Sequence, residues 1–507
     1  MKKATNLLII ILFGTFFTAI FYKQQIGLNL FLFNILILVL LHWVYKALDF
    51  KNELHIAVVS GSLLTAVGTL VHASTFVITM NILSLVLLFG VVNNRQARLL
   101  LNTAFSAIFQ YFTGIISLFQ RNEHTTEQKP KRIKNFWRWI GLALIPLFVL
   151  VVFFQLYSAS SSKFSAVFSF IGEFINKAFL FVFDNLNFAL LFLFLFGVVI
   201  ACGYFVRTKQ MTTIEEATTD ILERKRNRYY GHSTGLLNEF RMGMIMFSLL
   251  NVLLVIFNLI DIWHVWIHFE WSGDLLKEFV HEGTYTLIVT LFISIALVLV
   301  FFRKNLNFFS KNRPLKILAN IWIAQNAIMA TSVLIRNIHY INYYNLAYLR
   351  IGVLLFIVIA FFGLITVFVK INKMKNFYYL LRVNMLFTYV ALVLFSLPDW
   401  DVMIAKVNFS RADKAFVHLD FMVKLDDKAL PYLDKEIDIQ NIEKSPVYQL
   451  IGKGKEFLTP EDYKEAIAKR KSSFINDYPN RTFLEWNLAD RRAYKKLEER
   501  LKKNNEI

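Results

Sequence analysis

The sequence is poor in cysteine, proline and charge. Its single cysteine, Cys202, lies in an apolar run, which excludes an intramolecular disulfide and a thiolate cluster around a metal. Eight prolines occur in 507 residues, and Pro146 and Pro398 are almost the only ones in the apolar runs. Charged residues make up 18% of the chain, against about 25% in a typical soluble domain. These shortages exclude an ordinary soluble protein and leave few of the broken helices that transporters often contain.

Apolar residues make up 56% of the chain, including 52 phenylalanines. They come in blocks of about 17–25 residues, which are long enough to cross a hydrocarbon core of about 30 Å. We therefore predict an all-α, polytopic helical membrane protein with about 11 transmembrane helices. The first span is an uncleaved N-terminal segment, because its apolar run is long and no A-x-A cleavage site follows it. The others are expected near Ile26–Tyr45, His55–Val71, Ser74–Val92, Phe136–Tyr157, Leu180–Phe205, Leu236–Ile260, Thr284–Phe302, Ile317–Ile338, Leu346–Val369 and Phe377–Leu397.

Positive charge is concentrated in alternate loops between these spans. The net charge is +19, but residues 398–507 hold 21 basic and 20 acidic side chains, so nearly all of the excess lies among the spans. The loops Arg207–Arg228 and Lys370–Lys375 are basic, whereas the loop Asp261–Glu282 has a single basic residue. Because cytoplasmic loops carry such an excess, the pattern predicts an N-in, C-out topology. It also argues against nucleic acid as a partner.

A charged, polar stretch divides the predicted spans into two groups. The segment Leu99–Phe119 follows a basic patch and crosses the membrane, re-enters it or lies on its surface. Near the C-terminus, Thr459 and Pro460 have the residue types of a helix N-cap and a first helical position. The predicted domains are a four-span module with this extra segment (1–120), a basic cytoplasmic linker (121–134), a seven-span core module (135–397) and a small, mostly helical, extracytoplasmic C-terminal domain (398–507).

Polar and ionisable residues gather between Asp261 and Arg350, in otherwise apolar surroundings. Such residues are costly inside a bilayer and are functional-site candidates by default. Arg336 lies one turn from the outer end of its span and Arg350 about one turn into the next, so both are candidates to bind a carboxylate, a phosphate or a lipid head group. Alternatively, the arginines reach the interface or pair with neighbouring acids, and the amides join helices. The candidate binding residues are Arg336, His339, Arg350, His281, Glu282, Asp399, Asp401, Gln325 and Asn326.

Three histidines are candidate metal ligands. His264 and His268 are one helical turn apart and His281 follows, a pattern that can hold Zn²⁺ with an open position. Tryptophans alternate with the first two histidines, which is equally typical of an aromatic belt at the membrane surface. The sequence has no HExxH and no other catalytic motif, so we predict no catalytic residue and no cofactor.

Several stretches of the sequence resemble a known family. Similarity to an uncharacterised bacterial integral membrane family, a domain of unknown function, is carried by LLNEFRMG, IDIWHVW, LVHEGTYTLI, LANIWIAQNAIM, RNIHYINYYNLAYLRIGV, LPDWDVMIAKVN and HLDFMVKLDDKALPYLD. The resemblance covers roughly Leu236–Asp434, with a further similarity at Trp486–Tyr494, and the first four spans fall outside it. It implies a multi-pass protein of the bacterial inner membrane, without implying an activity or site residues.

Three functions are compatible with these features. The first is a non-enzymatic envelope binding protein, scaffold or sensor, whose outward-facing polar cluster binds an anionic ligand or lipid head group and whose C-terminal domain binds an envelope protein. The second is a transporter of a small anionic or lipid-like solute, with Gln325 and Asn326 beside its path. The third is a membrane-embedded, metal-dependent enzyme. We favour the first, because neither a catalytic motif nor an inverted repeat is evident.

Overall fold

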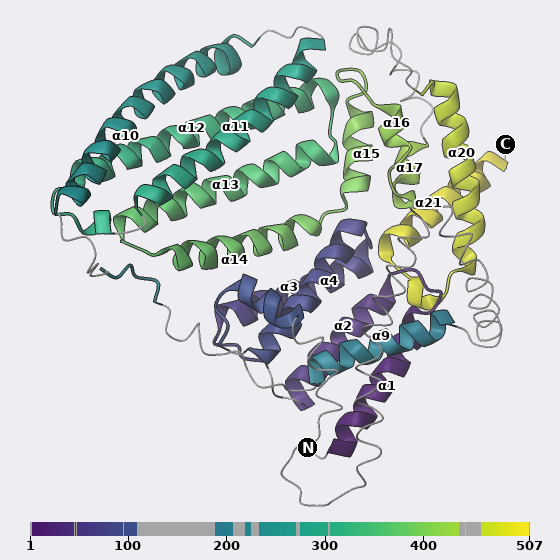
Figure 1. Ribbon diagram of the computed structural model, residues 1–507. Helices are drawn as coiled ribbons and strands as arrows, with labels where there is room; N and C mark the ends of the chain where they lie inside the picture. Colours follow the sequence, from purple (N-terminus) through teal and green to yellow (C-terminus); the bar gives the residue numbers. More distant parts are fainter. Residues whose placement is uncertain are drawn as a thin grey trace, which may run out of the picture. The chain divides into compact units, whose positions relative to one another are not determined.

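The computed structural model shows a helical protein (Figure 1), with no strand among the residues that it describes. These are residues 3–44, 46, 48–94, 96–108, 188–205, 219–224, 233–269, 274–302, 305–434, 442 and 458–505. The chain divides into two compact units, Met1–Lys23 with Gln110–Thr208, and Gln24–Phe109 with Lys209–Ile507. The predicted domains divide the chain along different lines and remain a prediction.

The first unit pairs helix α1 (Lys3–Phe21) with α9 (Phe188–Phe205). A Cβ placed on Gly197 would lie 2.9 Å from the Cβ of Phe17 and 3.1 Å from the Cα of Gly14. The backbones of α1 and α9 can come this close only because Gly14 and Gly197 carry no side chain. Small residues commonly permit such contacts between membrane helices, where burial of apolar surface provides little driving force.

The second unit contains a row of long helices around α12 (Arg313–Tyr344). Pro314 occupies the first turn of α12, and the helix ends at Asn345, whose φ of 61° is left-handed. Helix α12 contacts α10, α11 and α13, and α13 contacts α14, so these helices lie side by side (Figure 1). The other helices of this unit's apolar part are α2 (Leu28–Val39), the π-helical η1 (Leu40–Val44), α3 (Glu53–Val71), α4 (Thr75–Asn93), α10 (Ser233–Asp261), α11 (Asp274–Phe301), α13 (Tyr348–Asn372) and α14 (Phe377–Ser396).

Six helices are long and apolar enough to cross a membrane, which supports the predicted membrane class. They are Glu53–Val71, Thr75–Asn93, Leu236–Ile267, Arg313–Tyr344, Tyr348–Asn372 and Phe377–Ser396. Four shorter apolar helices coincide with further predicted spans: Leu8–Phe21, Leu28–Trp43, Ala189–Ala201 and Leu287–Phe301. The span predicted at Phe136–Tyr157 lies outside the described residues, as do the linker and residues 109–119 of the Leu99–Phe119 segment. The count of about eleven spans and the topology remain predictions.

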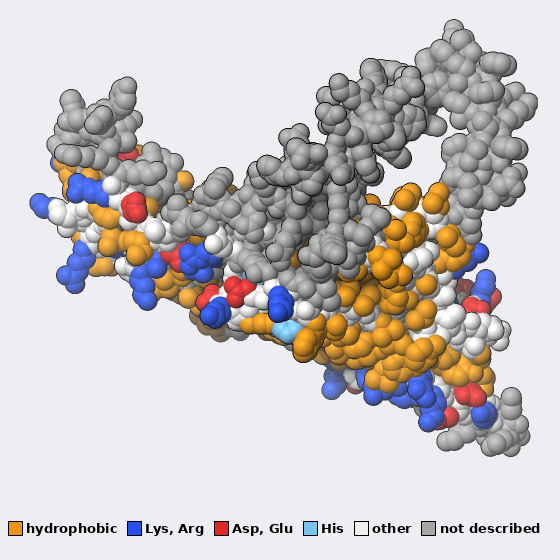
Figure 2. All heavy atoms as spheres, turned by 90° about the horizontal axis from the view of Figure 1, so that it is seen from below, with side chains coloured by type: hydrophobic (Ala, Val, Ile, Leu, Met, Phe, Trp, Pro, Cys, Tyr) orange, Lys and Arg blue, Asp and Glu red, His pale blue; other side chains and the backbone are white. Residues whose placement is uncertain are grey.

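Much of the surface of the described helices is apolar. On the face shown in Figure 2, hydrophobic side chains form a continuous area, and Lys and Arg side chains gather at its border. On α10, Ile245, Leu249 and Val252 are more than half exposed. An apolar face exposed along a helix in this way is expected where the helix meets lipid rather than water.

The C-terminal part of the second unit, from residue 398 onward, is a cluster of helices that we call the C-terminal domain, and its core also includes Ile351 of α13. Buried residues of this core include Phe409, Leu433, Tyr463 and Leu497. The predicted helix start at Thr459 and Pro460 is confirmed. Thr459 is the N-cap, and its Oγ1 accepts a hydrogen bond from the Asp462 amide at 3.2 Å. The helices are α15 (Trp400–Ser410), α16 (Leu419–Met422), η4 (Asp427–Ala429), α17 (Leu430–Leu433), α20 (Pro460–Asp477), η5 (Tyr478–Asn480), η6 (Phe483–Glu485) and α21 (Leu488–Asn505).

This C-terminal domain docks on the apolar helices through backbone and amide contacts. The Leu28 amide at the start of α2 donates to the Trp486 carbonyl at 3.0 Å. A Cβ on Gly27 would lie 2.5 Å from the Glu485 carbonyl oxygen, so only glycine fits. Between α12 and α13, the Leu346 amide donates to Asn408 Oδ1 at 2.9 Å. The domain is therefore attached at several ends of the apolar helices.

Helices α2, α3 and α4 are joined by a buried polar cluster that the sequence analysis did not predict. Asn34 Nδ2 donates to Asn81 Oδ1 at 2.9 Å, and Ser62 Oγ donates to Asn34 Oδ1 at 2.8 Å. Helix α14 then packs across Gly61, where an added Cβ would lie 2.1 Å from the Tyr389 hydroxyl. Amide contacts of this kind hold membrane helices together.

Candidate functional site

An ion pair lies between α10 and α12 at the end of the bundle that also carries Asn345. Arg336 donates through one guanidinium nitrogen to Asp261 Oδ1, and Ser332 Oγ donates to Asp261 Oδ2. Trp266 Nε1 donates to the Ser332 hydroxyl at 2.7 Å. The side chains of Arg336 and Asp261 are only 7% and 5% exposed. Buried charges of this kind persist because each compensates the other's desolvation.

Amides continue this polar line toward the middle of the helices. Gln325 Nε2 donates to Asn251 Oδ1 at 2.6 Å, and Asn251 Nδ2 donates to the Leu318 carbonyl at 3.0 Å. Asn258 Nδ2 donates to the backbone carbonyl of Gln325 at 3.2 Å. We call the whole line the α10–α12 seam. It consists of Asn251, Asn258, Asp261, Gln325, Ser332 and Arg336.

Three buried amide oxygens in or next to the seam accept no hydrogen bond from the described residues. They are Asn258 Oδ1, Gln325 Oε1 and Asn326 Oδ1. Asn326 itself only donates to the Trp322 carbonyl of its own helix, at 2.7 Å. Unpaired buried amide oxygens are uncommon because each forfeits its hydration.

The histidines near the seam make different contacts. His339 Nε2 donates to the Val265 carbonyl at 3.2 Å, and its ring stacks on Phe269 with the centroids 4.0 Å apart. His264 Nδ1 contacts the carbonyl of Ile260 in its own helix at 2.9 Å, and the His268 ring lies 4.1 Å from that of Trp263, tilted by 32°. A π-helical turn, η2 (Ile262–Ile267), carries this segment. The side chains of His281 and Glu282 lie outside the described set, and the described residues contain no group of three metal-ligating side chains.

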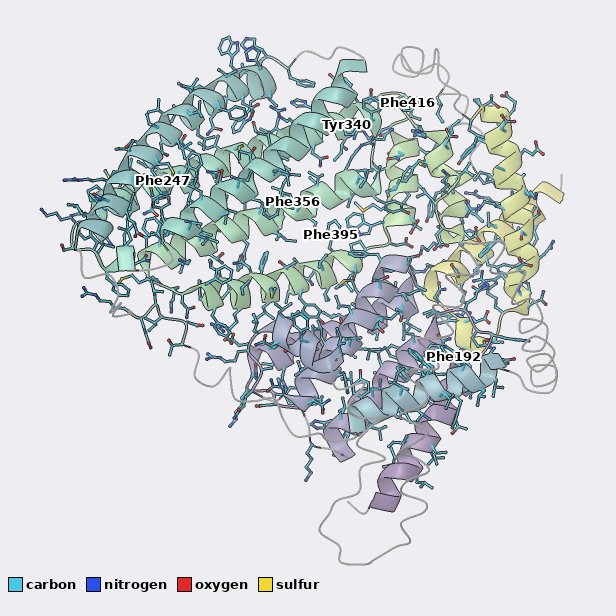
Figure 3. All side chains as sticks on the ribbon, viewed as in Figure 1. Phe192, Phe247, Tyr340, Phe356, Phe395 and Phe416 are labelled. Carbon is cyan, nitrogen blue, oxygen red and sulfur yellow. The ribbon has the colours of Figure 1, made fainter. Side chains whose placement is uncertain are left out.

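Arg350 closes the C-terminal end of α12. Its guanidinium donates to the carbonyls of Tyr344 and Asn345 at 2.6 and 2.5 Å. The guanidinium carbon also lies 4.2 Å from the ring centroid of Tyr340, which is labelled in Figure 3. A cation at a helix C-terminus is favourable because the unpaired carbonyls there carry partial negative charge. In this structure Arg350 acts as a helix cap.

A second charged group surrounds Lys428, whose side chain is 1% exposed. Its Nζ donates to the His72 carbonyl at 2.9 Å and lies 3.0 Å from Asp426 and 3.7 Å from Asp401. The Tyr348 hydroxyl donates to Asp401 Oδ1 at 2.5 Å. With Asp399, these residues form what we call the Lys428 cluster: His72, Tyr348, Asp399, Asp401, Asp426 and Lys428. It joins the α3–α4 connection, the start of α13, the exit from α14 and the C-terminal domain.

Burial and charge set the protonation states in this cluster. Burial raises the pKa of Asp399 to about 6, and the nearby Lys428 ammonium only partly offsets this rise. Burial and then Lys428 lower the pKa of His72 to about 4. His72 Nδ1 accepts from the Ser74 amide at 3.3 Å, whereas Nε2 faces the Leu397 carbonyl at 2.9 Å and must donate. The imidazole is therefore neutral, with its proton on Nε2.

The same carboxylates act on the lysine. Burial opposes a charge on Lys428, but Asp426, Asp399 and Asp401 outweigh it and raise its pKa. Lys428 thus remains an ammonium ion beside a neutral imidazole. The cluster contains one permanent cation and a carboxyl group, Asp399, that can exchange its proton near neutral pH.

Arg336, Arg350 and Asp401, which were predicted to share one binding site, each contact a different partner in the structure. Arg336 meets Asp261, Arg350 caps α12, and Asp401 meets Lys428. Sequence reasoning did not select Asp261, Tyr348, Asp426, Lys428 or His72. The stretch HLDFMVKLDDKALPYLD did contain the key lysine, but a lysine among aspartates in a polar tail is normally solvated.

Comparison with models of known families gives a match. A family model described as Domain of unknown function (DUF4153) covers residues 59–436. It includes α4 and most of α3, so the expectation that the first four spans lie outside the family is wrong for the third and fourth. Both helices contact α14, so they pack against the helices that follow them in the matched region. No curated protein and no solved structure matches the chain.

Proposed function

Since the chain belongs to the DUF4153 family, whose activity is undefined, we propose from its own geometry that it is a multi-pass membrane protein that works by binding, as an envelope scaffold or sensor. The observation that carries this proposal is the Lys428 cluster. One buried ammonium of the C-terminal domain donates to the His72 carbonyl, after α3, and pairs with Asp401, which accepts from Tyr348 of α13. A conformational change in the C-terminal domain can therefore be transmitted directly to the apolar helices through Lys428.

The position of the C-terminal domain supports this role. Its contacts with Leu28, His72 and Leu346 all involve connections that the charge pattern assigns to the outer side of the membrane. In the proposed arrangement the domain lies outside the bacterial inner membrane and binds an envelope protein or an anionic ligand.

Hydrogen exchange of the full-length protein in detergent tests the coupling. The substitution Lys428→Gln removes the cation, and Lys424→Gln, at an exposed lysine nearby, is the matched control. We expect Lys428→Gln to accelerate exchange both in α15–α17 and around His72, because the two regions share the ammonium. Acceleration in only one of these regions contradicts the proposed coupling. A periplasm-active reporter fused after Ile507 tests the outer location and is expected to be active.

Transport is the second candidate, and the unpaired oxygens of Asn258, Gln325 and Asn326 favour it. They could accept hydrogen bonds from a passing solute with N–H or O–H groups. However, a cavity near Met329 and Ala330 has a volume of about 10 Å³, room for about one water, and only apolar side chains line it. Uptake into proteoliposomes that is lost in Gln325→Leu would establish transport in place of a binding role.

A further inference from the structure

A cavity of about 220 Å³ lies where α11 and α13 end and α14 begins. Its lining residues are Leu222, Leu299, Val300, Lys370 and Phe377. Four of them are apolar and one carries a positive charge. The cavity lies away from the α10–α12 seam and from the Lys428 cluster, at the helix ends that carry the basic Lys370–Lys375 loop.

Lys370 is buried in this cavity, with 2% of its surface exposed. Its Nζ donates to the Phe302 carbonyl at 2.7 Å and so caps the end of α11. An ammonium group has three hydrogens to donate, and among the described residues no carboxylate pairs with this one. The acid of the neighbouring segment, Asp220, is engaged with Arg382 at 2.6 Å. A buried cation next to an apolar cavity calls for an anionic partner.

The wall of the cavity is held in place by backbone contacts. The Leu222 amide donates to the Met374 carbonyl at 2.9 Å, and the Asn376 amide donates to the Asp220 carbonyl at 3.0 Å. The segment 219–224 is thus fastened across the start of α14. The cavity is part of the folded arrangement and not a gap beside a loose loop.

The surroundings indicate what the anion is attached to. Val300 is 51% exposed, and Ile293 and Val289, further back along α11, are 61% and 56% exposed. At spacings of seven and four residues, these side chains share one face of the helix, which can accommodate an acyl chain. At the other edge, Lys375 adds positive charge. Basic pockets between membrane helices of this kind bind phospholipid head groups.

We infer that this cavity binds the phosphate head group of an anionic membrane lipid, with Lys370 as its direct partner. The phosphate accepts the remaining ammonium hydrogens of Lys370, and the acyl chain follows the exposed face of α11. No step of this binding involves the Lys428 cluster, so the inference is independent of the proposed function.

Native mass spectrometry of the full-length protein tests the site. The protein is mixed in separate arms with phosphatidylglycerol, phosphatidylcholine and inorganic phosphate. We expect phosphatidylglycerol to be retained over phosphatidylcholine, and Lys370→Gln to weaken retention about tenfold, as for the loss of a charge-assisted hydrogen bond. The control Lys373→Gln removes an exposed lysine from the same helix end and should retain the lipid. Equal losses in both variants, or no loss in Lys370→Gln, overturn the site.

A second variant separates binding from folding. Leu299→Trp fills the cavity but keeps the contact between Lys370 and Phe302, and it should also lose phosphatidylglycerol. In thermal unfolding, the lipid should raise the melting temperature of the native protein and of Lys373→Gln but not of Leu299→Trp. An equal rise in Leu299→Trp contradicts the assignment. If inorganic phosphate alone produces the full rise, the occupant is a free anion and the lipid assignment fails.

Discussion

Arg336 of α12 and Asp261 of α10 form an ion pair inside the helix bundle, and the hydroxyl of Ser332 donates to the same carboxylate. The pair fixes the register of the two helices because each charge has its compensating partner on the neighbouring helix. A shift by one turn would leave both charges buried without these contacts.

A double-mutant cycle measures this dependence. Asp261→Asn or Arg336→Gln alone leaves one buried charge uncompensated and is expected to lower the free energy of unfolding by about 3–5 kcal/mol. The double variant should lose less than the sum of the two. Arg313→Gln, at an exposed position of the same helix, is the control and should change little. Additive losses would show that the two residues act independently.

The pH dependence of stability should be nearly flat between about pH 4 and 6, because two groups oppose each other. The folded state raises the pKa of Asp399 from 3.8 to about 6. The stability that Asp399 contributes to the folded state is therefore present at low pH and is lost as the pH rises through 6. The folded state lowers the pKa of His72 from 6.5 to about 4, so its contribution is present above 6.5 and is lost as the pH falls through 4.

Single substitutions should reveal the two slopes. With His72→Asn, stability is expected to fall as the pH rises from 4 to 6, since only the effect of Asp399 remains. With Asp399→Asn, stability should rise over the same range because only that of His72 remains. Chemical unfolding of the full-length protein at several pH values checks both. Parallel profiles for the two variants would refute this assignment.

Gly61→Ala is expected to loosen the contact between α3 and α14. The added methyl group would lie 2.1 Å from the Tyr389 hydroxyl, which itself donates to Ser84 Oγ at 2.8 Å. Overpacking of this kind costs about 1–3 kcal/mol. Gly363→Ala, on another helix that contacts α14, is a matched control, because its nearest atom would be 3.8 Å away. Thermal melting should therefore separate the two variants.

Gly27→Ala is expected to release the C-terminal domain from α2. Its Cβ would meet the backbone carbonyl of Glu485, which cannot move without breaking the bond from the Leu28 amide to Trp486. Limited proteolysis should then cut the region 478–490 faster than in the native protein. Gly352→Ala, whose Cβ would meet nothing within 4 Å, should leave the cleavage unchanged. Unchanged cleavage in Gly27→Ala would mean that this contact does not hold the domain.

Local features of the sequence were sufficient to predict the class and many of the elements. The apolar blocks marked the helices from α10 to α14 because bilayer thickness sets a minimum helix length. Thr459 and Pro460 marked the start of α20, because capping depends on neighbouring residues alone. The resemblance to the family was likewise visible in the sequence, although its match extends to residue 59.

Partner choice, by contrast, was decided by the tertiary structure. The sequence showed that Arg336 and Asp401 were ionisable residues in or beside apolar spans, but not that Asp261 and Lys428 would meet them. When a helix is equally apolar on every side, its sequence pattern does not indicate which face packs against which neighbouring helix. The pairing of α10 with α12, and the docking of the C-terminal domain beside His72, arise from packing between distant parts of the chain. Sequence alone therefore predicted a helical protein with helices apolar enough to cross a membrane, and packing determined which of its charges lie together.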